Sequence, residues 1–251
     1  MELFVIPMGT CGCMMDVVAP GVSDGNQVQL PVSSYLVRLE DGRNVMVDTG
    51  MSRLHIKDPQ VTWRGTAIAD ALQPSMTEEH DLEVQLDLLG MDARDIDFVI
   101  NTHFHFDHAG NNDLFTRATF LVQREHYEVA LGNPAFPNRY WNLPHRRFEL
   151  LEGDTELFPG VEAILTPGHA PGHQSVMVRL PVDGPFIICG DALYSQLNID
   201  HDNWSAQADP VAARVSGMRL LKLAETESAT LLFGHDGRQA ASLICAPGAY
   251  R

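Results

Sequence analysis

The alternation of apolar runs and polar turns predicts a chain built mainly from short buried strands, with a few helices between them. Apolar segments bounded by Gly, Pro, Asn and Asp are typical of strands in a layered α/β protein. The expected strands are ELFVIP (2–7), SSYLVRL (33–39), NVMVDTG (44–50), DFVINTH (97–103), ATFLVQ (118–123), FELLEG (148–153), VEAILTPGH (161–169), QSVMVRL (174–180), PFIICGDA (185–192) and ATLLFGHD (229–236).

One helix is expected after a loop that covers residues 51–76 and shows no clear periodicity. Thr77 is a suitable N-cap, and the two glutamates that follow it favour the positive end of a helix. Leu82, Leu86 and Leu89 recur at helical spacing and would bury one face, and Gly90 would end the helix.

A second helix is expected near the end of the chain. Asp209 would cap it and Pro210 would occupy its first position, a pair typical of a helix start. The residues expected to face inward are Val211, Val215, Met218 and Leu221. No flexible linker interrupts the pattern, so residues 1–251 are expected to form a single domain.

Composition and charge narrow the classes of partner. The formal net charge of −16 would repel a polyanion such as DNA or RNA, so a small or neutral substrate is favoured. No apolar stretch has the length of a membrane span, and MELFVIPMG does not resemble a secretory signal. The four cysteines, Cys11 and Cys13 among them, are interpreted as reduced thiols of a cytoplasmic protein.

Metal-ligand residues follow four of the expected strands. They lie in NTHFHFDH (101–108), TPGHAPGH (166–173), ICGDALY (188–194) and LFGHD (232–236). Strand ends are rigid, and the carboxyl ends of strands commonly form active sites in layered α/β proteins. Alternation would send His103 and His105 to one side and Phe104 to the other. Imidazole and carboxylate ligands spread in this way suit two divalent ions, with zinc favoured and iron, manganese or cobalt as alternatives.

These motifs resemble the metallo-β-lactamase superfamily, whose His-x-His-x-Asp-His signature matches residues 103–108. The early VDTG (47–50) fits the same superfamily. The resemblance implies an αββα sandwich, in which two mixed sheets pack face to face between outer helices, with the site at one edge. It assigns His103, His105 and His169 to one metal, Asp107, His108 and His235 to the second, and Asp191 to a bridge between them.

Within that superfamily, the chain is most similar to the N-acyl homoserine lactone lactonases. HFDHAGNN, TPGHAPGHQS and GDALY fall where this branch has near-identical strings. His105 stands where the oxygen-reducing diiron branch has glutamate, and Asp191 is a bridging residue that true zinc β-lactamases lack. The short segment after His235 differs from the helical extension of glyoxalase II.

The resemblance implies hydrolytic opening of a lactone by a hydroxide that bridges the two metals. Tyr194 would contact the lactone oxygens, and Asp107 could orient the hydroxide and carry the proton to the leaving oxygen. Asp48 and His173 are expected to support the ligands rather than bind metal. Candidate residues for an acyl channel are Met14, Met15, Trp63 and Phe106, each of which could equally be ordinary packing. The expected partner is a small lactone, and the protein would be a monomer or a homodimer.

Two other hypotheses stay open on the sequence alone. The same metal chemistry could act on another small lactone or ester, such as an aromatic, pyridoxolactone-like compound. A noncatalytic metal-binding module with this fold is the alternative from another class, although an open position for water argues against it.

Overall fold

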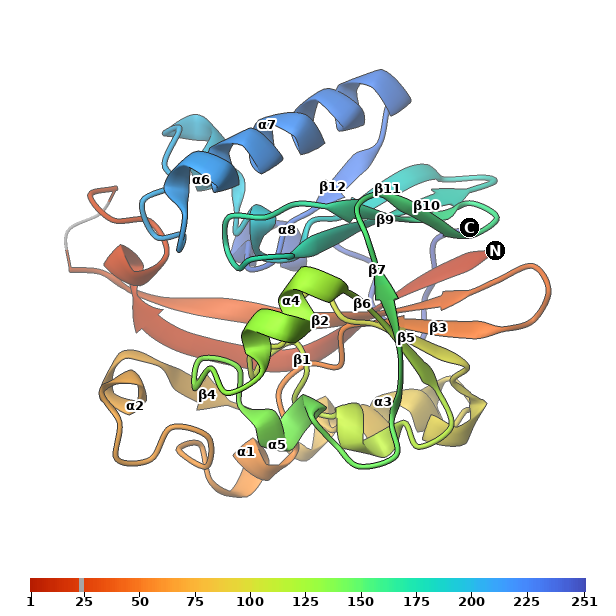
Figure 1. Ribbon diagram of the computed structural model, residues 1–251, viewed down its shortest axis with the longest axis horizontal. Helices are drawn as coiled ribbons and strands as arrows, with labels where there is room; N and C mark the ends of the chain where they lie inside the picture. The colour runs from red at the N-terminus through yellow and green to blue at the C-terminus, as the bar shows by residue number, and fades with distance from the viewer. Residues whose placement is uncertain (23–24) are drawn as a thin grey trace.

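Two β-sheets packed face to face form the centre of the molecule, with helices on their outer faces (Figure 1). The computed structural model describes residues 1–22 and 25–251. Within these residues the larger sheet has seven strands, in the order β4-β1-β2-β3-β5-β6-β7, and the smaller has five, in the order β12-β11-β10-β9-β8.

The larger sheet consists of β1 (Glu2–Met14), β2 (Gln27–Arg38), β3 (Asn44–Val47), β4 (Gln73–Ser75), β5 (Phe98–Ile100), β6 (Thr119–Gln123) and β7 (Arg147–Leu151). The smaller sheet consists of β8 (Thr155–Phe158), β9 (Val161–Leu165), β10 (Gln174–Leu180), β11 (Gly184–Ile188) and β12 (Thr230–Leu232). The helices are α1 (Leu54–Lys57), α2 (Ala67–Ala71), α3 (Leu82–Leu88), α4 (Arg124–Ala130), α5 (Asn138–Trp141), α6 (Gln196–Asp200), α7 (Pro210–Glu227) and α8 (Gly237–Ala240).

Successive residues of β1 show how the layers are built. Leu3 and Val5 point into the core between the sheets, where they join Val176 of the smaller sheet. Phe4 and Ile6 point the opposite way, into a second core shared with α3. Since both faces of the strand are buried, its sequence is an unbroken apolar run. These layers confirm the expected αββα sandwich.

Helix α7 covers the smaller sheet, together with α6 (Figure 1). It begins as expected, because the Asp209 side chain accepts hydrogen bonds from two backbone amides of the first turn and Pro210 follows. The expected inward face is wrong, however: Val211, Val215 and Met218 are exposed.

The buried face of α7 consists of smaller side chains and one leucine, namely Ala213, Ser216, Gly217 and Leu220. Small residues allow the helix to approach its neighbours closely, because a Cβ atom on Gly217 would lie 2.0 Å from Trp204 Cη2. A pattern based on large apolar residues therefore selects the wrong face.

The helix expected from Thr77 also begins differently. Thr77 caps only a short 3₁₀ turn (Glu78–His80), and Asp81 is the N-cap of α3. Leu82 and Leu86 are buried as expected, and Gly90 follows the helix with a positive φ of 69°. The expected unstructured loop 51–76 contains α1, α2 and β4, which joins the edge of the larger sheet.

Several strands end earlier than the apolar pattern suggests. Strand β5 ends at Ile100 and β9 at Leu165, so that the histidines which follow lie in loops. Backbone bonds between these loops replace the ladder: the Gln174 amide donates to the Thr102 carbonyl at 3.0 Å, and the Thr166 amide to the His173 carbonyl at 2.8 Å. None of the described helices is long and apolar enough to cross a lipid bilayer.

Candidate active site

Four loops that follow strands of both sheets bring their polar side chains to one end of the sandwich. The loop after β5 carries residues 103–108, the loop between β9 and β10 carries His169, and a 3₁₀ turn after β11 carries Asp191. His235 follows β12. The structure thus brings together all seven of the side chains that the sequence proposes as metal ligands.

The first group consists of three imidazoles and one carboxylate oxygen. His103 Nε2, His105 Nδ1 and His169 Nε2 lie 2.9 to 3.1 Å from one another. Asp191 Oδ2 is 3.2 Å from His169 Nε2 and 3.8 Å from His103 Nε2. Ligand atoms at such separations can surround one small cation with metal–ligand distances of about 2 Å.

The second group shares the carboxylate of Asp191 through its other oxygen. His108 Nε2 and His235 Nε2 each lie 3.2 Å from Asp191 Oδ1. Asp107 Oδ2 lies 3.8 Å from the same two nitrogens. The two oxygens of Asp191 therefore face two separate ligand groups, an arrangement that suits two divalent ions joined by one carboxylate.

The state of these side chains fits bound cations. Burial holds the pKa of His103 and of His105 well below its usual range, so both imidazoles are neutral and can offer lone pairs. Among the described residues, His108 Nε2 and Asp191 Oδ1 are buried without a hydrogen bond of normal geometry. Unpaired buried polar atoms are costly, and coordination of a cation would satisfy both.

The second ligand group is held by carboxylates. Burial opposes a charge on His108, but the carboxylates of Asp191, Asp107 and Asp48 outweigh it and raise the pKa of its imidazole. For Asp191, burial is likewise outweighed, here by His108 and His235, so its pKa lies well below its usual range. The carboxylate that faces both groups is therefore ionised.

Asp48 lies behind the second ligand group, where the sequence places a supporting residue. Its carboxylate accepts hydrogen bonds from His108 Nδ1 at 2.8 Å and from the Thr102 hydroxyl and backbone amide at 2.7 and 2.8 Å. The bond to Nδ1 turns Nε2 of His108 toward the centre.

His173 lies behind Asp191 rather than within either ligand group. The Asp191 backbone amide donates to His173 Nε2 at 3.1 Å, and His173 Nδ1 donates to the Thr166 hydroxyl at 2.9 Å. Gly190 is required at this contact, because a Cβ atom there would lie 2.8 Å from His173 Nε2 and its φ is 53°.

Two further buried residues support the ligands but do not appear in the sequence motifs. His126, at the start of α4, accepts a bond from the Phe104 amide at 2.8 Å and donates to the Pro171 carbonyl at 2.9 Å. Gln207, before α7, contacts His169 and Asp191. Both lie far from the ligand motifs in the sequence, and no strand-end pattern marks them.

Tyr194 lies beside the first ligand group, three residues after Asp191. Its hydroxyl is 3.0 Å from His169 Nδ1. Burial, together with the negative charge of Asp191 and Asp107, raises the pKa of Tyr194 well above its usual range. The phenol therefore keeps its proton at neutral pH and can serve as a hydrogen-bond donor.

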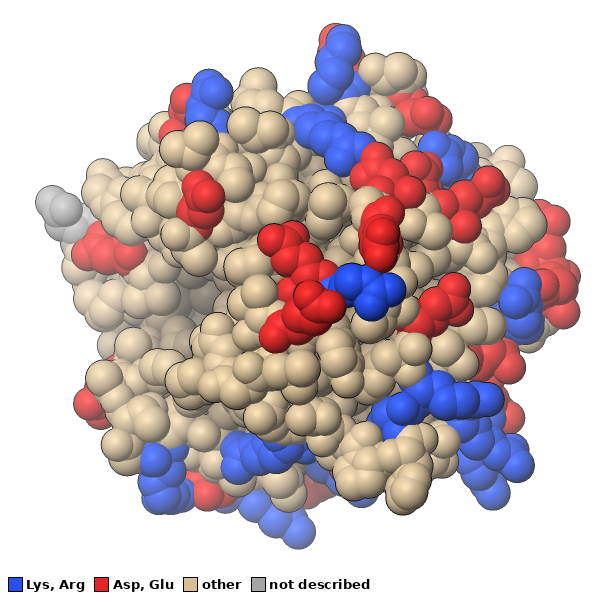
Figure 2. All heavy atoms as spheres, viewed as in Figure 1, with Lys and Arg blue, Asp and Glu red and all other residues tan. Residues whose placement is uncertain are grey.

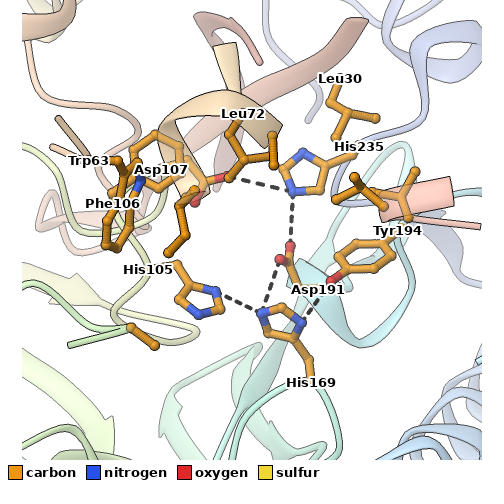
Figure 3. Close-up of a pocket in the computed structure, with 15 residues that line it drawn as sticks. Leu30, Trp63, Leu72, His105, Phe106, Asp107, His169, Asp191, Tyr194 and His235 are labelled. Atoms are coloured by element: carbon orange, nitrogen blue, oxygen red, sulfur yellow. Dashed lines mark hydrogen bonds and ion pairs between the residues drawn. The ribbon is translucent and has the colours of Figure 1, made fainter. Parts of the chain in front are cut away.

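A cavity of about 300 Å³ opens directly onto both ligand groups. Trp63 and Phe106 lie together on one side of it, with ring centroids 5.8 Å apart, and Tyr194 lies on the other side (Figure 3). The rest of the wall is mostly apolar and includes Val17, Val18, Leu30, Ile68, Ala71, Leu72 and Ala135. In the space-filling view, a hollow with a mainly uncharged rim opens on the left (Figure 2).

The two methionines proposed for the acyl channel lie elsewhere. Met14 lines a separate, smaller cavity with Cys13, and Met15 is not among the described residues that line the main cavity. Met14 precedes, and Met15 begins, the 3₁₀ turn (Met15–Val17) whose last residue, Val17, does reach the cavity wall. Cys11 and Cys13 are buried free thiols, in accord with the reduced state expected.

Comparisons with known proteins agree with this architecture. The model of the metallo-beta-lactamase superfamily matches residues 28–235. N-acyl homoserine lactonase AiiA from Bacillus thuringiensis subsp. kurstaki is 35% identical over 238 residues, which is 95% of this chain and 94% of the relative. N-acyl homoserine lactonase AttM from Azorhizobium caulinodans is 31% identical over 266 residues, covering 99% of this chain and 98% of that protein.

A solved structure shows the same fold with a product in place. It is an N-acyl homoserine lactone hydrolase with N-hexanoyl-L-homoserine bound at its catalytic metal centre. The TM-score is 0.92 at 34% identity, and the match covers 99% of this chain and 98% of that one.

Proposed function

Because the chain belongs to the metallo-β-lactamase superfamily, we propose that it is a metal-dependent lactonase that opens the ring of N-acyl homoserine lactones. The observation that carries the proposal is the pair of ligand groups around Asp191, which open onto an apolar cavity. Similarity to lactonases over nearly the whole chain supports the same substrate class.

The residues divide between metal binding and substrate contact. His103, His105, His169 and Asp191 would hold one cation, and Asp107, His108 and His235, with the other oxygen of Asp191, would hold the second. When bound, the two cations supply Lewis-acid polarisation of the ester carbonyl and a water acidified enough to attack it.

Tyr194 and Asp107 would serve the reacting atoms. The Tyr194 phenol keeps its proton, so it can donate to the oxygen that gains negative charge when the carbonyl is attacked. Asp107 lies in the cavity wall and can pass a proton to the ring oxygen as the C–O bond breaks. The product is the open hydroxy acid.

The apolar part of the cavity would hold the acyl chain. Trp63 and Phe106 face the cavity as an aromatic pair, and the aliphatic side chains opposite complete a wall that excludes water. Burial of each methylene there contributes about 0.8 kcal/mol.

The proposal also covers the identity of the metal ions and the assembly state of the protein. Zinc suits the histidine-rich ligand set best, and cobalt, manganese or iron are alternatives. Four further statements are predictions from the sequence. The protein is expected to be a monomer or a homodimer, to lie in the cytoplasm, to form a single domain and to bind no nucleic acid.

The test is a ring-opening assay on the zinc- or cobalt-loaded protein. N-hexanoyl and N-decanoyl homoserine lactone are compared with an aromatic lactone and an aryl ester, and proton release is followed. The highest kcat/KM is expected for the acyl homoserine lactones, whereas a preference for the aromatic lactone would reassign the substrate.

Asp191→Asn is the variant for the same assay, because it removes the charge that faces both ligand groups. Turnover should fall by at least about 100-fold, since such groups act as a unit. Full activity in this variant would contradict the proposed centre.

A further inference from the structure

Gln207 connects two of the metal ligands from outside the metal centre. Its side chain is buried, with 5% of its surface exposed, in the segment that leads into α7. We propose that Gln207 is a positioning residue that fixes the tautomer of His169 and thereby leaves the Tyr194 hydroxyl proton for the substrate. This inference rests on the proposed lactonase function only in its second half.

The orientation of the Gln207 amide follows from its partner on one side. Gln207 Nε2 lies 3.0 Å from the backbone oxygen of Asp191. A carbonyl oxygen can only accept, so the NH₂ group of the amide must face it. The amide oxygen therefore faces the other way, where Oε1 lies 2.9 Å from His169 Nδ1.

That orientation in turn fixes the proton on His169. Because Oε1 can only accept, Nδ1 must carry a hydrogen and donate it. In the neutral imidazole, Nε2 then has a free lone pair. It faces His103 Nε2 at 3.1 Å, His105 Nδ1 at 2.9 Å and Asp191 Oδ2 at 3.2 Å, which is the direction of the first metal.

The same proton decides what Tyr194 can do. The tyrosine hydroxyl lies 3.0 Å from His169 Nδ1, and a protonated Nδ1 cannot accept a hydrogen bond from it. The single hydrogen on Nδ1 is directed to Gln207 Oε1 and the oxygen of Tyr194 can only share it, so the hydrogen of the tyrosine hydroxyl is left to point elsewhere. Tyr194 lines the cavity, and that hydrogen can be donated to a substrate oxygen there. The Gln207 amide thus orients His169 for metal binding and leaves the Tyr194 hydroxyl able to donate to the substrate.

Two substitutions separate this role from simple packing. Gln207→Met keeps the length of the side chain but removes both the acceptor and the donor, whereas Gln207→Glu keeps an acceptor for Nδ1–H and replaces the donor to Asp191 with a carboxylate oxygen. Gln85→Met is the matched control, because the Gln85 amide is also buried and donates to a backbone carbonyl, that of Glu79, but lies in α3, which carries none of the ligand residues.

The first readout is retention of cobalt or zinc against a chelator, followed spectroscopically without substrate. Gln207→Met should bind metal about 10- to 100-fold more weakly, as is usual when a partner of a metal-bound histidine is removed. Gln207→Glu should stay within about 3-fold of the unmodified protein, and Gln85→Met should leave metal retention unchanged even where it lowers the melting temperature.

The second readout is kinetic, with N-hexanoyl homoserine lactone. In metal-saturated Gln207→Met, kcat should fall while KM changes little, because a His169 ring that Gln207 no longer holds can turn and shift the Tyr194 hydroxyl, which lies 3.0 Å from its Nδ1. Equal metal retention in Gln207→Met and the unmodified protein would overturn the proposal, as would equal losses in the Met and Glu variants. If the unmodified protein opens no lactone, the proposed function fails, but metal retention still tests the tautomer.

Discussion

At the scale of single residues, the site depends on buried groups that join the ligand loops. His126 is the clearest case, because it accepts from the Phe104 amide in one ligand loop and donates to the Pro171 carbonyl in another. Both bonds require a neutral ring with its proton on Nδ1. Burial agrees, since it lowers the pKa of His126 from 6.5 to about 4.

Replacement of His126 should therefore destabilise the protein through two unpaired backbone groups. His126→Leu is expected to lower the free energy of unfolding by about 2 to 6 kcal/mol, at about 1 to 3 kcal/mol for each of the two groups. His126→Gln, which can both accept and donate, should lose less. Urea denaturation followed by circular dichroism measures the difference, and equal losses in the two variants would contradict this role for the hydrogen bonds.

The low pKa of His126 also predicts a loss of stability in acid. Between pH 6.5 and about 4 the unfolded chain binds a proton at this residue and the folded chain does not, so the folded state loses stability as the pH falls. The contribution reaches about 3 kcal/mol near pH 4. The free energy of unfolding should therefore fall more steeply between pH 6.5 and about 4 for the unmodified protein than for His126→Gln. If the difference between the two proteins is the same at every pH, the effect is excluded.

At the scale of elements, the segment 51–76 forms a wall of the cavity and is tied to α5. His55 Nε2 lies 2.8 Å from the Thr62 hydroxyl, which lies 2.6 Å from the Tyr140 hydroxyl. Trp63 is the next residue along the chain, so this chain of hydrogen bonds fixes the position of an aromatic that lines the cavity.

Removal of the Tyr140 hydroxyl should weaken binding of the acyl chain and leave the rate of ring opening almost unchanged. Tyr140→Phe is expected to raise KM for N-decanoyl homoserine lactone several-fold, about 1 kcal/mol for one hydrogen bond, with kcat little changed. Tyr127→Phe is the control, because the Tyr127 ring, in α4, packs on Trp141 of α5 and Phe148 of β7 and does not line the cavity. An equal fall in kcat for both substitutions would refute the assignment.

The sequence predicts the ligand motifs well, but it does not predict the buried face of α7 or the residues that support the ligands. The strand-end motifs located the seven side chains that the structure brings together as candidate ligands, because residues of these few types recur immediately after apolar runs. The inward face of α7 was wrong, because Ala213 and Gly217 pack closely where Val211 and Val215 were expected. Gln207 and His126 could not be found, because only folding brings them near their partners, which for His126 are backbone groups and for Gln207 are a backbone carbonyl and His169.

At the scale of the whole molecule, the metal centre joins the two sheets. His103, His105, Asp107 and His108 follow a strand of the larger sheet, whereas His169, Asp191 and His235 follow strands of the smaller one. Without cations, the three neutral imidazoles of the first ligand group crowd together in a buried space with no donor for their lone pairs, which is unfavourable. Bound metal should therefore stabilise the association of the sheets.

Metal removal is accordingly expected to lower the melting temperature by several degrees, and added zinc or cobalt should restore it. Ligands that bind only the folded state stabilise it by about 2.7 kcal/mol at one hundred times their dissociation constant. Differential scanning calorimetry measures the shift, with Asp191→Asn as the variant that should respond weakly to a chelator. A melting temperature that is insensitive to chelation would show that the cations contribute nothing to folding.

The distribution of the ligands along the chain has a consequence for biosynthesis. A nascent polypeptide that has emerged only as far as α6 already displays His103, His105, Asp107, His108, His169 and Asp191, but it lacks His235 and the strand β12 that positions it. Full occupancy by two cations must then wait until translation has passed that point. The first ligand group is thus complete before β12 is made, whereas the second cation could be held by its full set of residues only after His235 has emerged.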